Sequence, residues 1–253
     1  MFSRKDFDYG LLDAVAHRPW PLPDRPWVMT QSWHDLLFAH WAIDRDRLRA
    51  LVPAGIEIDL HDGQAWLGIV PFHMTNVAPR GVPNLPWVSA FPELNVRTYV
   101  VRDRKPGVYF FSLDAANPLA VAAARALFNL PYYAARMHVE TADGSVRYES
   151  RRTGKQRTAA LSCRYRPMGG VSVPVPGTLE HFLTERYCLY VVDSSRVRRL
   201  EIHHRPWRLQ PAELEIATNT MADAAGVSLP PAAPLLHFSA RQDMVAFPME
   251  TVE

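Results

Sequence analysis

The chain has 253 residues and a formal net charge of +2, so its charge balance gives no reason to expect nucleic acid or an anionic membrane as a partner. Hydrophobic residues make up 48% and charged residues 21%, the balance of an ordinary globular protein. No stretch reaches the roughly 18 apolar residues of a membrane span. Charged residues interrupt positions 1–20, where a signal peptide would be apolar. We therefore expect a cytoplasmic protein.

The first residues are rich in proline. Prolines at positions 19, 21, 23 and 26 disfavour a helix and predict an extended path. Trp20 and Trp27 are large apolar side chains that could pin this segment to the rest of the protein. We expect a loosely structured, proline-rich N-terminal arm over residues 1–26. A single domain over residues 27–253 should follow, because no linker-like segment divides it.

Alternation and turn residues predict the elements that follow the arm. We expect strands over 28–41, 56–60 and 64–74, and a short helix over 45–51 that Asp44 caps. The residues His-Asp-Gly, which separate the second and third of these strands, are typical of a tight hairpin turn. Residues 77–88 contain four prolines and glycines and predict a long loop, of the kind that forms lids or partner contacts.

Residues 91–140 carry the clearest pattern and predict strand, turn, strand, helix and strand. In the first strand, period two places four polar side chains on one face: Glu93, Asn95, Arg97 and Tyr99. In the second strand, the same alternation places Ser112 and Asp114 on one face together with Val108 and Phe110.

The helix expected after this hairpin has a clear beginning. Asn117 should cap it, and Pro118 occupies the first helical position, where a missing N–H has no cost. Apolar residues at helical spacing, Leu119 and Ala122 among them, form the face that we expect to pack on a sheet. Because Arg125 is the only charge, we expect the helix to be largely buried.

The second half of the chain predicts more strands than helices. Strands are expected over 146–152, 159–165, 188–192, 197–203, 209–216 and 235–248, and short helices over 179–185 and 221–225. About ten strands with short connections favour an α+β fold. The dominant sheet should be mostly antiparallel and curled or closed, with a few short packed helices.

Known catalytic motifs are missing from the sequence. It has no G-x-S-x-G elbow, no phosphate-binding loop, no dinucleotide-binding G-x-G-x-x-G and no C-x-x-C. His203 and His204 would face opposite sides of a strand and could not easily hold one ion. Cys163 and Cys188 lie in apolar, strand-like contexts and should be buried thiols. We expect neither a metal ion nor a cofactor.

The polar face of the 91–100 strand allows two interpretations. It could meet solvent, or it could line a pocket. In a pocket, Arg97 could bind a carboxylate through two hydrogen bonds, and Glu93 could transfer a proton if burial raised its pKa. Glu93 and Arg97 could also form a structural ion pair.

Further residues could contribute to such a pocket. Asn95 and Tyr99 share the strand face with Glu93, and one phenol of Tyr132 or Tyr133 could point into the same space. Ser112 and Asp114 are additional candidates for substrate binding, although Asp114 could equally be a turn residue before the helix.

Seven segments together resemble the YqjF-like family of uncharacterised bacterial proteins: FPELNVRTYV, FFSLDAANPLAV, LPYYAARM, YESRRT, PGTLEHFLTERYCLY, IHHRPW and LLHFSARQDMVAFP. The resemblance extends from about residue 20 to residue 248. That family is distantly similar to the acetoacetate decarboxylase-like superfamily. The resemblance implies a curled antiparallel sheet around an inner pocket, helices packed outside, and a homo-oligomer.

Acetoacetate decarboxylases use a lysine that forms a Schiff base with a β-keto acid. The resemblance places Tyr132 and Tyr133 where that lysine and its activating neighbour belong, and Glu93 where the pocket glutamate belongs. A tyrosine cannot form a Schiff base, and the three lysines of this chain lie in the arm or in turns: Lys5, Lys105 and Lys155. The decarboxylase chemistry therefore does not transfer, although the pocket can.

Three hypotheses follow for the function. The first is an enzyme (a lyase, an isomerase or a hydratase) that acts on a small oxygenated or carboxylated molecule, with Glu93 as its acid or base. The second is a binding or sensor protein that uses the same pocket without catalysis. The third is a structural protein that contacts a partner through the arm or the 77–88 loop.

Overall fold

The computed structural model describes residues 6–85, 88–153, 158–193 and 196–252, apart from a few side chains within one helix. The described elements, in chain order, are η2 (Tyr9–Asp13), β1 (Met29–Ile43), α1 (Arg45–Arg49), β2 (Glu57–Ile58), β3 (Ala65–Pro79), β4 (Phe91–Arg102), β5 (Lys105–Ala115), α2 (Pro118–Phe128), β6 (Tyr132–Ala142), β7 (Ser145–Arg152), β8 (Ala160–Pro167), α3 (Leu179–Thr184), β9 (Cys188–Asp193), β10 (Arg196–His204), β11 (Gln210–Asn219), α4 (Met221–Ala224), β12 (Leu235–Ala246) and β13 (Glu250–Val252).

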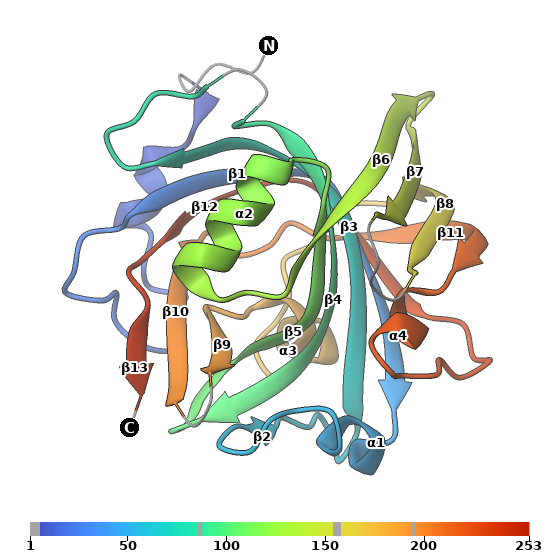
Figure 1. Ribbon diagram of the computed structural model, residues 1–253, viewed down its shortest axis with the longest axis horizontal. Coiled ribbons are helices and arrows are strands. Elements are labelled where there is room, and N and C mark those ends of the chain that lie inside the picture. The colour runs from blue at the N-terminus through green and yellow to red at the C-terminus, as the bar shows by residue number, and fades with distance from the viewer. Residues whose placement is uncertain (1–5, 86–87, 154–157, 194–195, 253) are drawn as a thin grey trace.

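One large sheet dominates the protein and curls strongly, with α2 lying against it (Figure 1). Its strand pairs are antiparallel except where β5 meets β6 and β9. Following the pairs leads from β1 through β3, β4, β5, β9, β10 and β12 back to β1. A second route leads from β5 through β6, β7, β8 and β11 to β12. The expected curled, mostly antiparallel α+β fold is confirmed.

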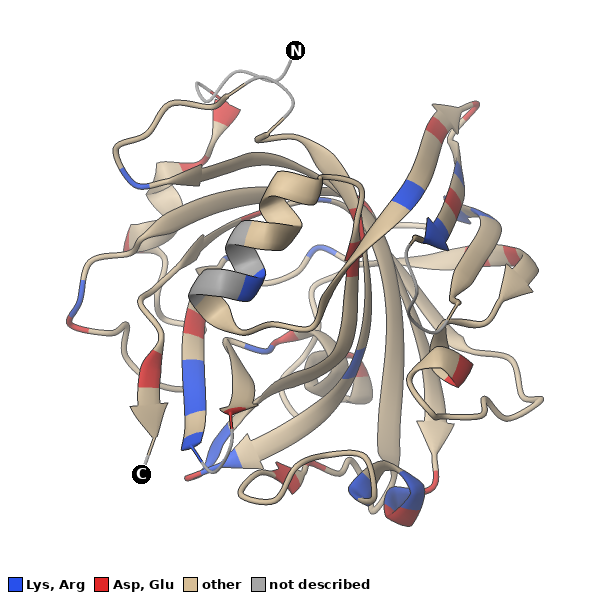
Figure 2. Ribbon diagram, viewed as in Figure 1, with Lys and Arg blue, Asp and Glu red and all other residues tan. Residues whose placement is uncertain are grey.

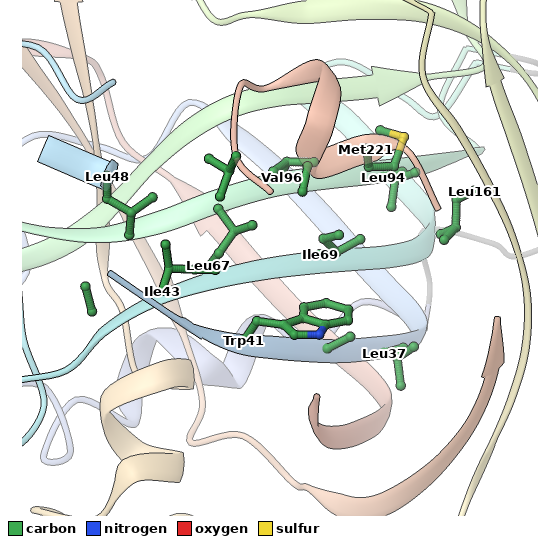
Figure 3. Close-up of a cluster of buried hydrophobic side chains, with 14 of the residues drawn as sticks. Leu37, Trp41, Ile43, Leu48, Leu67, Ile69, Leu94, Val96, Leu161 and Met221 are labelled. Carbon is green, nitrogen blue, oxygen red and sulfur yellow. The ribbon is translucent and has the colours of Figure 1, made fainter. Parts of the chain in front are cut away.

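Strands β1, β3 and β4 connect β12 to β5, so they close both routes into circuits, and they bury side chains on both faces. One face supplies the larger core, which includes Leu37, Ile69 and Leu94 (Figure 3). The opposite face supplies Phe38 and Phe72 to a separate cluster. Burial on both faces of a strand favours a sequence without charged residues. Strand β3, for example, carries no Lys, Arg, Asp or Glu (Figure 2).

Three β-bulges interrupt the pairing of the shared strands. The register between β1 and β3 shifts near Asp35 and near Asn76, which have φ angles of 48° and 54°. The register between β4 and β5 shifts where Phe111 is the extra residue. A bulge bends its strand and reverses which side chains face inward. These three positions therefore help the sheet to curl and determine which residues reach its interior.

Helix α2 begins as predicted but is less buried than predicted. The Asn117 Oδ1 accepts hydrogen bonds from the backbone N–H groups of Leu119 and Ala120, at 3.0 and 3.2 Å. Val121 is buried, whereas Leu119 is 69% exposed and Ala122 is also exposed. Among the α2 side chains that the structure describes, most are exposed or half-buried, so the expectation of a largely buried helix is not borne out for that part of the helix.

Strand β3 extends further than the alternation of residues 64–74 predicted. It continues through Pro79 and takes up the first residues of the predicted 77–88 loop. Backbone pairing with β1 reaches the end of β3, where Met29 lies opposite Pro79. The remaining loop is correspondingly shorter, and residues 86–87 lie outside the described residues.

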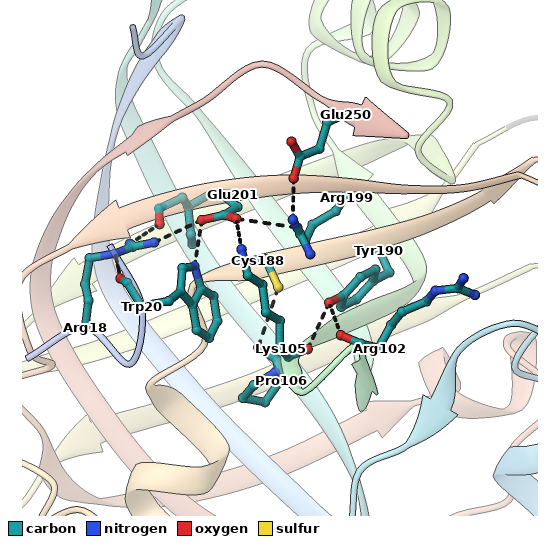
Figure 4. Close-up of polar contacts among 11 residues, drawn as sticks. Arg18, Trp20, Arg102, Lys105, Pro106, Cys188, Tyr190, Arg199, Glu201 and Glu250 are labelled. Carbon is teal, nitrogen blue, oxygen red and sulfur yellow. Dashed lines mark hydrogen bonds and ion pairs between the residues drawn. The ribbon is translucent and has the colours of Figure 1, made fainter. Parts of the chain in front are cut away.

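The N-terminal segment is better packed than a loosely structured arm. Leu11 of η2 is fully buried against Val245 and Phe247. The Glu201 carboxylate accepts hydrogen bonds from the Trp20 Nε1, at 2.7 Å, and from the Arg18 guanidinium, at 3.2 Å (Figure 4). This buried carboxylate fastens the segment to β10. Among the described residues, no helix is both long and apolar enough to cross a membrane.

Candidate functional site

A cavity of about 310 Å³ lies inside the first circuit of strands. All seven strands of that circuit contribute side chains to its wall, and α2 and the start of β6 complete it. Most lining side chains are apolar or aromatic. The polar side chains in the wall include Gln31, Glu93, Asn95, Arg97, Arg186 and His204. A mostly apolar cavity with a few convergent polar groups is the usual form of a small-molecule site. We call this space the inner cavity.

Strand β4 supplies the most polar part of the wall. Its pairing with β3 runs without a register shift from Phe91 to Thr98, so alternate residues keep to one face. Glu93 and Asn95 are only 3% and 6% exposed, and both line the inner cavity together with Arg97. The alternative in which this face meets solvent is therefore wrong.

Tyr99 lies on the same face of β4 but outside the cavity wall. Its side chain is fully buried, and its hydroxyl donates a hydrogen bond to the Leu183 carbonyl at 2.9 Å. The same hydroxyl lies 2.6 Å from Nε2 of His40, an imidazole whose pKa burial lowers well below its usual value. Tyr99 therefore packs beside the residues of the cavity wall and does not line the cavity itself.

The Glu93 carboxyl group is buried without a cationic partner. The Tyr132 hydroxyl donates a hydrogen bond to its Oε2 at 2.9 Å. No Lys, Arg or His nitrogen of the described residues forms an ion pair with it. Burial raises the pKa of Glu93 to about 8, and hydrogen bonds from Tyr132 and Asn95 limit the rise. At neutral pH the group is mostly protonated and can donate a proton.

Arg97 is the corresponding unpaired cation. Its Nη2 donates to the Leu183 carbonyl at 3.3 Å, and its guanidinium lies 5.3 Å from the Phe38 ring centroid. No carboxylate of the described residues pairs with it, so the alternative of a structural ion pair between Glu93 and Arg97 is not observed. The buried Arg97 Nε and Asn95 Oδ1 both lack a hydrogen-bond partner. Such orphaned polar atoms are costly unless a ligand or water satisfies them.

The bulge at Phe111 removes two predicted residues from the site. Val108 and Phe110 line the inner cavity as expected, but beyond the bulge it is Leu113 that does so. Ser112 and Asp114 consequently lie on the opposite face. The expectation that they share a face with Phe110 is wrong, because the extra residue reverses the alternation.

Asp114 instead forms a buried ion pair with Arg152 of β7. Two parallel hydrogen bonds, of 2.9 and 2.7 Å, join the guanidinium to the two carboxylate oxygens. The Arg152 guanidinium also lies 3.8 Å from the Tyr133 ring centroid. Tyr133 therefore points away from the inner cavity, whereas Tyr132 lines it. Of these two phenols, that of Tyr132 lines the inner cavity and that of Tyr133 does not.

Sequence reasoning missed several residues of the wall. Gln31 and Trp33 alternate along β1 just as Glu93 and Asn95 do along β4, so the same period-two pattern could have identified them. Arg186 and Trp207 reach the cavity from segments outside the strands, and no local pattern marks them.

The described residues offer no evident place for a metal ion or for a Schiff base. They contain no group of three or more His, Cys, Asp or Glu side chains close enough to hold a metal ion. Lys105 lies outside the inner cavity, with its Nζ 2.9 Å from the Glu201 carboxylate. Lys5 and Lys155 lie outside the described residues.

Comparisons with known proteins identify relatives along nearly the whole chain. The profile of the DUF2071 family, described as "Uncharacterized conserved protein", matches residues 30–243. "Uncharacterized protein YqjF" from Bacillus subtilis (strain 168) is 46% identical over 228 residues, which cover 90% of this chain and 94% of that protein.

Solved structures with the same fold are enzymes. "Enduracididine biosynthesis enzyme MppR complexed with pyruvate" superimposes with a TM-score of 0.61 at 12% identity and covers 94% of this chain and 93% of its own. Acetoacetate decarboxylase from Legionella pneumophila gives a TM-score of 0.58 at 14% identity and covers 96% of both chains. At such identities the likeness establishes the acetoacetate decarboxylase-like fold and nothing about the reaction.

Proposed function

This chain belongs to the DUF2071 family of uncharacterised conserved proteins, and we propose that it is an enzyme whose inner cavity binds a small carboxylated molecule. In this proposal Arg97 binds the carboxylate, Asn95 donates or accepts a further hydrogen bond, and Glu93 transfers a proton. The reaction class is that of a lyase, an isomerase or a hydratase acting beside a carbonyl group, without a Schiff base.

One observation carries the proposal. Within the part of the chain that the structure describes, strand β4 presents a carboxyl group without a cation and a guanidinium without a carboxylate to the same cavity. Their Cα atoms are separated by four residues, or roughly 13 Å along an extended strand. A small molecule between them would complete both sites at once. The printed name of MppR, which was solved with pyruvate, supports a small keto acid as the ligand class to test first.

A reaction without a Schiff base predicts a negative result in a trapping experiment. We expect borohydride to produce no mass increase when the protein is mixed with acetoacetate or pyruvate. Lys105 is held by Glu201 away from the inner cavity, and Tyr132 has no amine. Intact-mass spectrometry tests all three lysines of the chain together, including the two outside the described residues. A mass increase equal to the reduced adduct would contradict this mechanism.

The binding role of Arg97 can be tested with pyruvate and its uncharged amide. Pyruvate should raise the melting temperature of the wild-type protein, whereas pyruvamide should raise it much less. Arg97→Met, which keeps a long apolar side chain, should lose the pyruvate effect and weaken binding by roughly 10- to 100-fold, the value of one charge-assisted contact. Isothermal titration calorimetry measures the affinity directly.

Two controls distinguish loss of binding from loss of folding. Arg97→Lys keeps the charge and should retain part of the pyruvate effect, although it loses the two-pronged geometry. The melting temperature without ligand shows whether Arg97→Met is folded. Equal pyruvate binding by wild type and by folded Arg97→Met would remove Arg97 from the proposal.

The alternative of a binding or sensor protein uses the same residues without proton transfer. It is favoured if Glu93→Gln keeps pyruvate affinity and no proton exchange is detected for the wild type. The cytoplasmic location, the homo-oligomeric state and the division into an arm and one domain remain predictions.

A further inference from the structure

A second hollow lies outside the circuit of strands, against the same wall as the inner cavity. Its volume is about 460 Å³, and we call it the outer hollow. It is bordered by β9 on one side and by the segment between α2 and β6 on the other. Phenol rings and one exposed guanidinium give it a partly polar lining, which includes Tyr109, Arg125, Asn129, Tyr133 and Tyr190.

The outer hollow lies where the sheet is incomplete. One edge of β5 pairs continuously with β4. The other edge pairs with β9 at Val108 and Tyr109 and with β6 at residues 113–115, so residues 110–112 have no strand partner on that side. The wall of the inner cavity therefore has a gap that backbone hydrogen bonds do not close, and side chains alone fill it.

Local sequence limits how far β9 and β6, the strands on either side of the gap, pair with β5. Gly107 lets β9 approach β5 closely, because a Cβ atom there would lie 2.7 Å from the Cys188 carbonyl oxygen. Beyond Tyr190, strand β9 leaves β5 and pairs only with β10, through Val191 and Val192. On the other side Pro131 precedes β6 and offers no N–H to the sheet. Both flanks therefore leave the gap unpaired.

Three side chains separate the outer hollow from the inner cavity. Phe110, Leu130 and Tyr132 line both spaces. The Tyr132 hydroxyl reaches through to the Glu93 carboxyl group, and its backbone carbonyl accepts a hydrogen bond from the Arg125 Nε at 2.6 Å. Rotation of the Tyr132 side chain would break this single hydrogen bond of its hydroxyl.

We propose that the outer hollow is a side entrance to the inner cavity and that the Tyr132 side chain, with Phe110 and Leu130, is its gate. The identification of the passing molecule as a small organic anion rests on the proposed function. The route itself does not depend on that function. Arg125 is exposed at the mouth and would attract such an anion. Displacement of Tyr132 would also free the Glu93 carboxyl group at the moment a ligand arrives.

A buried reporter thiol tests the route without any ligand. Val70 lines the inner cavity, is 1% exposed and does not border the outer hollow. V70C should react with methyl methanethiosulfonate only as fast as the reagent enters the cavity. The native thiols Cys163 and Cys188 are buried, and burial raises the pKa of each to about 12. Cys188 lines the inner cavity and therefore reports entry of the reagent alongside V70C, whereas Cys163 does not line it. Peptide mapping distinguishes them from the reporter.

Blocking the hollow from outside should slow this reaction. Val192 borders the outer hollow but not the inner cavity. V192W in the V70C background should lower the labelling rate, because it obstructs the outer hollow and leaves only entry past less buried lining residues such as Pro79. V173W is the matched control, since Val173 is 56% exposed and borders neither space. It should leave the rate unchanged. V192F is a second variant if V192W is poorly folded, as judged by its melting temperature.

A pair of substitutions tests the gate. Y132A removes the ring and should speed labelling of V70C most, whereas Y132F keeps the ring but loses the hydrogen bond to Glu93 and should speed it less. The proposed route is overturned if folded V192W labels as fast as V70C alone, or if Y132A is no faster than Y132F.

Failure of the function and failure of the route give different results. Gated labelling of V70C without pyruvate binding would retain the route and refute the proposed function. Pyruvate binding together with unchanged labelling in V192W would retain the function and refute the route. Where pyruvate binds, V192W should slow its association and dissociation equally and leave its affinity unchanged, because a gate alters the barrier and not the bound state.

Discussion

Replacement of Glu93 by glutamine is expected to slow proton exchange of a bound keto acid by roughly 10²–10⁴-fold, the usual contribution of a positioned acid or base. Glutamine has nearly the same shape and can still accept a hydrogen bond from Tyr132, but it cannot take up a proton. The measurement is the loss of the methyl proton signal of pyruvate in D₂O, followed by NMR with wild type and with Glu93→Gln. Equal exchange rates in the two proteins would rule out Glu93 as the acid or base.

The pH dependence of this exchange follows from the raised pKa of Glu93. Proton abstraction needs the ionised form, so the exchange rate should rise with pH and level off above about 8. Tyr132→Phe removes a hydrogen bond that stabilises the ionised form and therefore should move the midpoint to higher pH. A positioning role of Tyr132 thus gives a shifted profile, whereas a purely structural role would change only the melting temperature.

The free energy of unfolding should also depend on the protonation of Glu93. The folded state binds the Glu93 proton more tightly than the unfolded chain does, since the pKa rises from 4.5 to about 8 on folding. This contribution is fully present below pH 4.5 and is lost as pH rises through about 8. Between these values the free energy of unfolding should fall by up to about 1.4 kcal/mol per pH unit. The slope should be smaller in Glu93→Gln, which has no proton to lose.

Local sequence predicted the parts of the fold that depend on local interactions. The Asn117 cap, the Asp44 cap and the strand alternation of β4 all involve neighbours within a few residues, and each is present. The direction of the β4 face also depends on what covers it. The sequence left open whether this face meets solvent or lines a pocket, and in the structure Glu93 and Asn95 are buried.

The errors at the candidate site have one physical cause. Strict alternation assumes a regular strand, and one extra residue at Phe111 is enough to turn Ser112 and Asp114 to the other face. Phe111 is flanked by Phe110 and Ser112 and has no glycine or proline to indicate a bulge. The ion pair considered between Glu93 and Arg97 is absent for a different reason. Arg97 contacts the Leu183 carbonyl and Glu93 contacts the Tyr132 hydroxyl, and the sequence of one strand does not reveal either neighbour.

Substitution of Asp114 in its buried ion pair with Arg152 is expected to lower the free energy of unfolding strongly. Asp114→Asn should lower the free energy of unfolding by about 3–5 kcal/mol, because it leaves the Arg152 guanidinium buried without a carboxylate. Arginine cannot lose its proton in compensation. Arg152→Met should cost less, because burial already raises the pKa of Asp114 against the pull of Arg152, and the isolated carboxyl group can become neutral. Urea unfolding at neutral pH measures both.

An exposed ion pair serves as the control that shows whether burial or charge causes the loss of stability in Asp114→Asn. The Arg166 and Glu213 side chains form an ion pair at 2.7 Å, with 54% of each exposed. Glu213→Gln should change the free energy of unfolding by no more than about 1 kcal/mol. The double variant Asp114→Asn/Arg152→Met should recover part of the loss seen in Asp114→Asn, since no unpaired charge remains.

The same variants decide whether Asp114 has any part in ligand binding. The bulge turns Asp114 away from the inner cavity, so a folded Asp114→Asn protein should keep the pyruvate affinity of the wild type, measured below its melting temperature. If Asp114→Asn instead kept its stability and lost pyruvate binding, Asp114 would belong to the site and the pair with Arg152 would be secondary. A structural role of Asp114 therefore lowers stability and leaves pyruvate affinity unchanged, whereas a binding role lowers affinity and leaves stability unchanged.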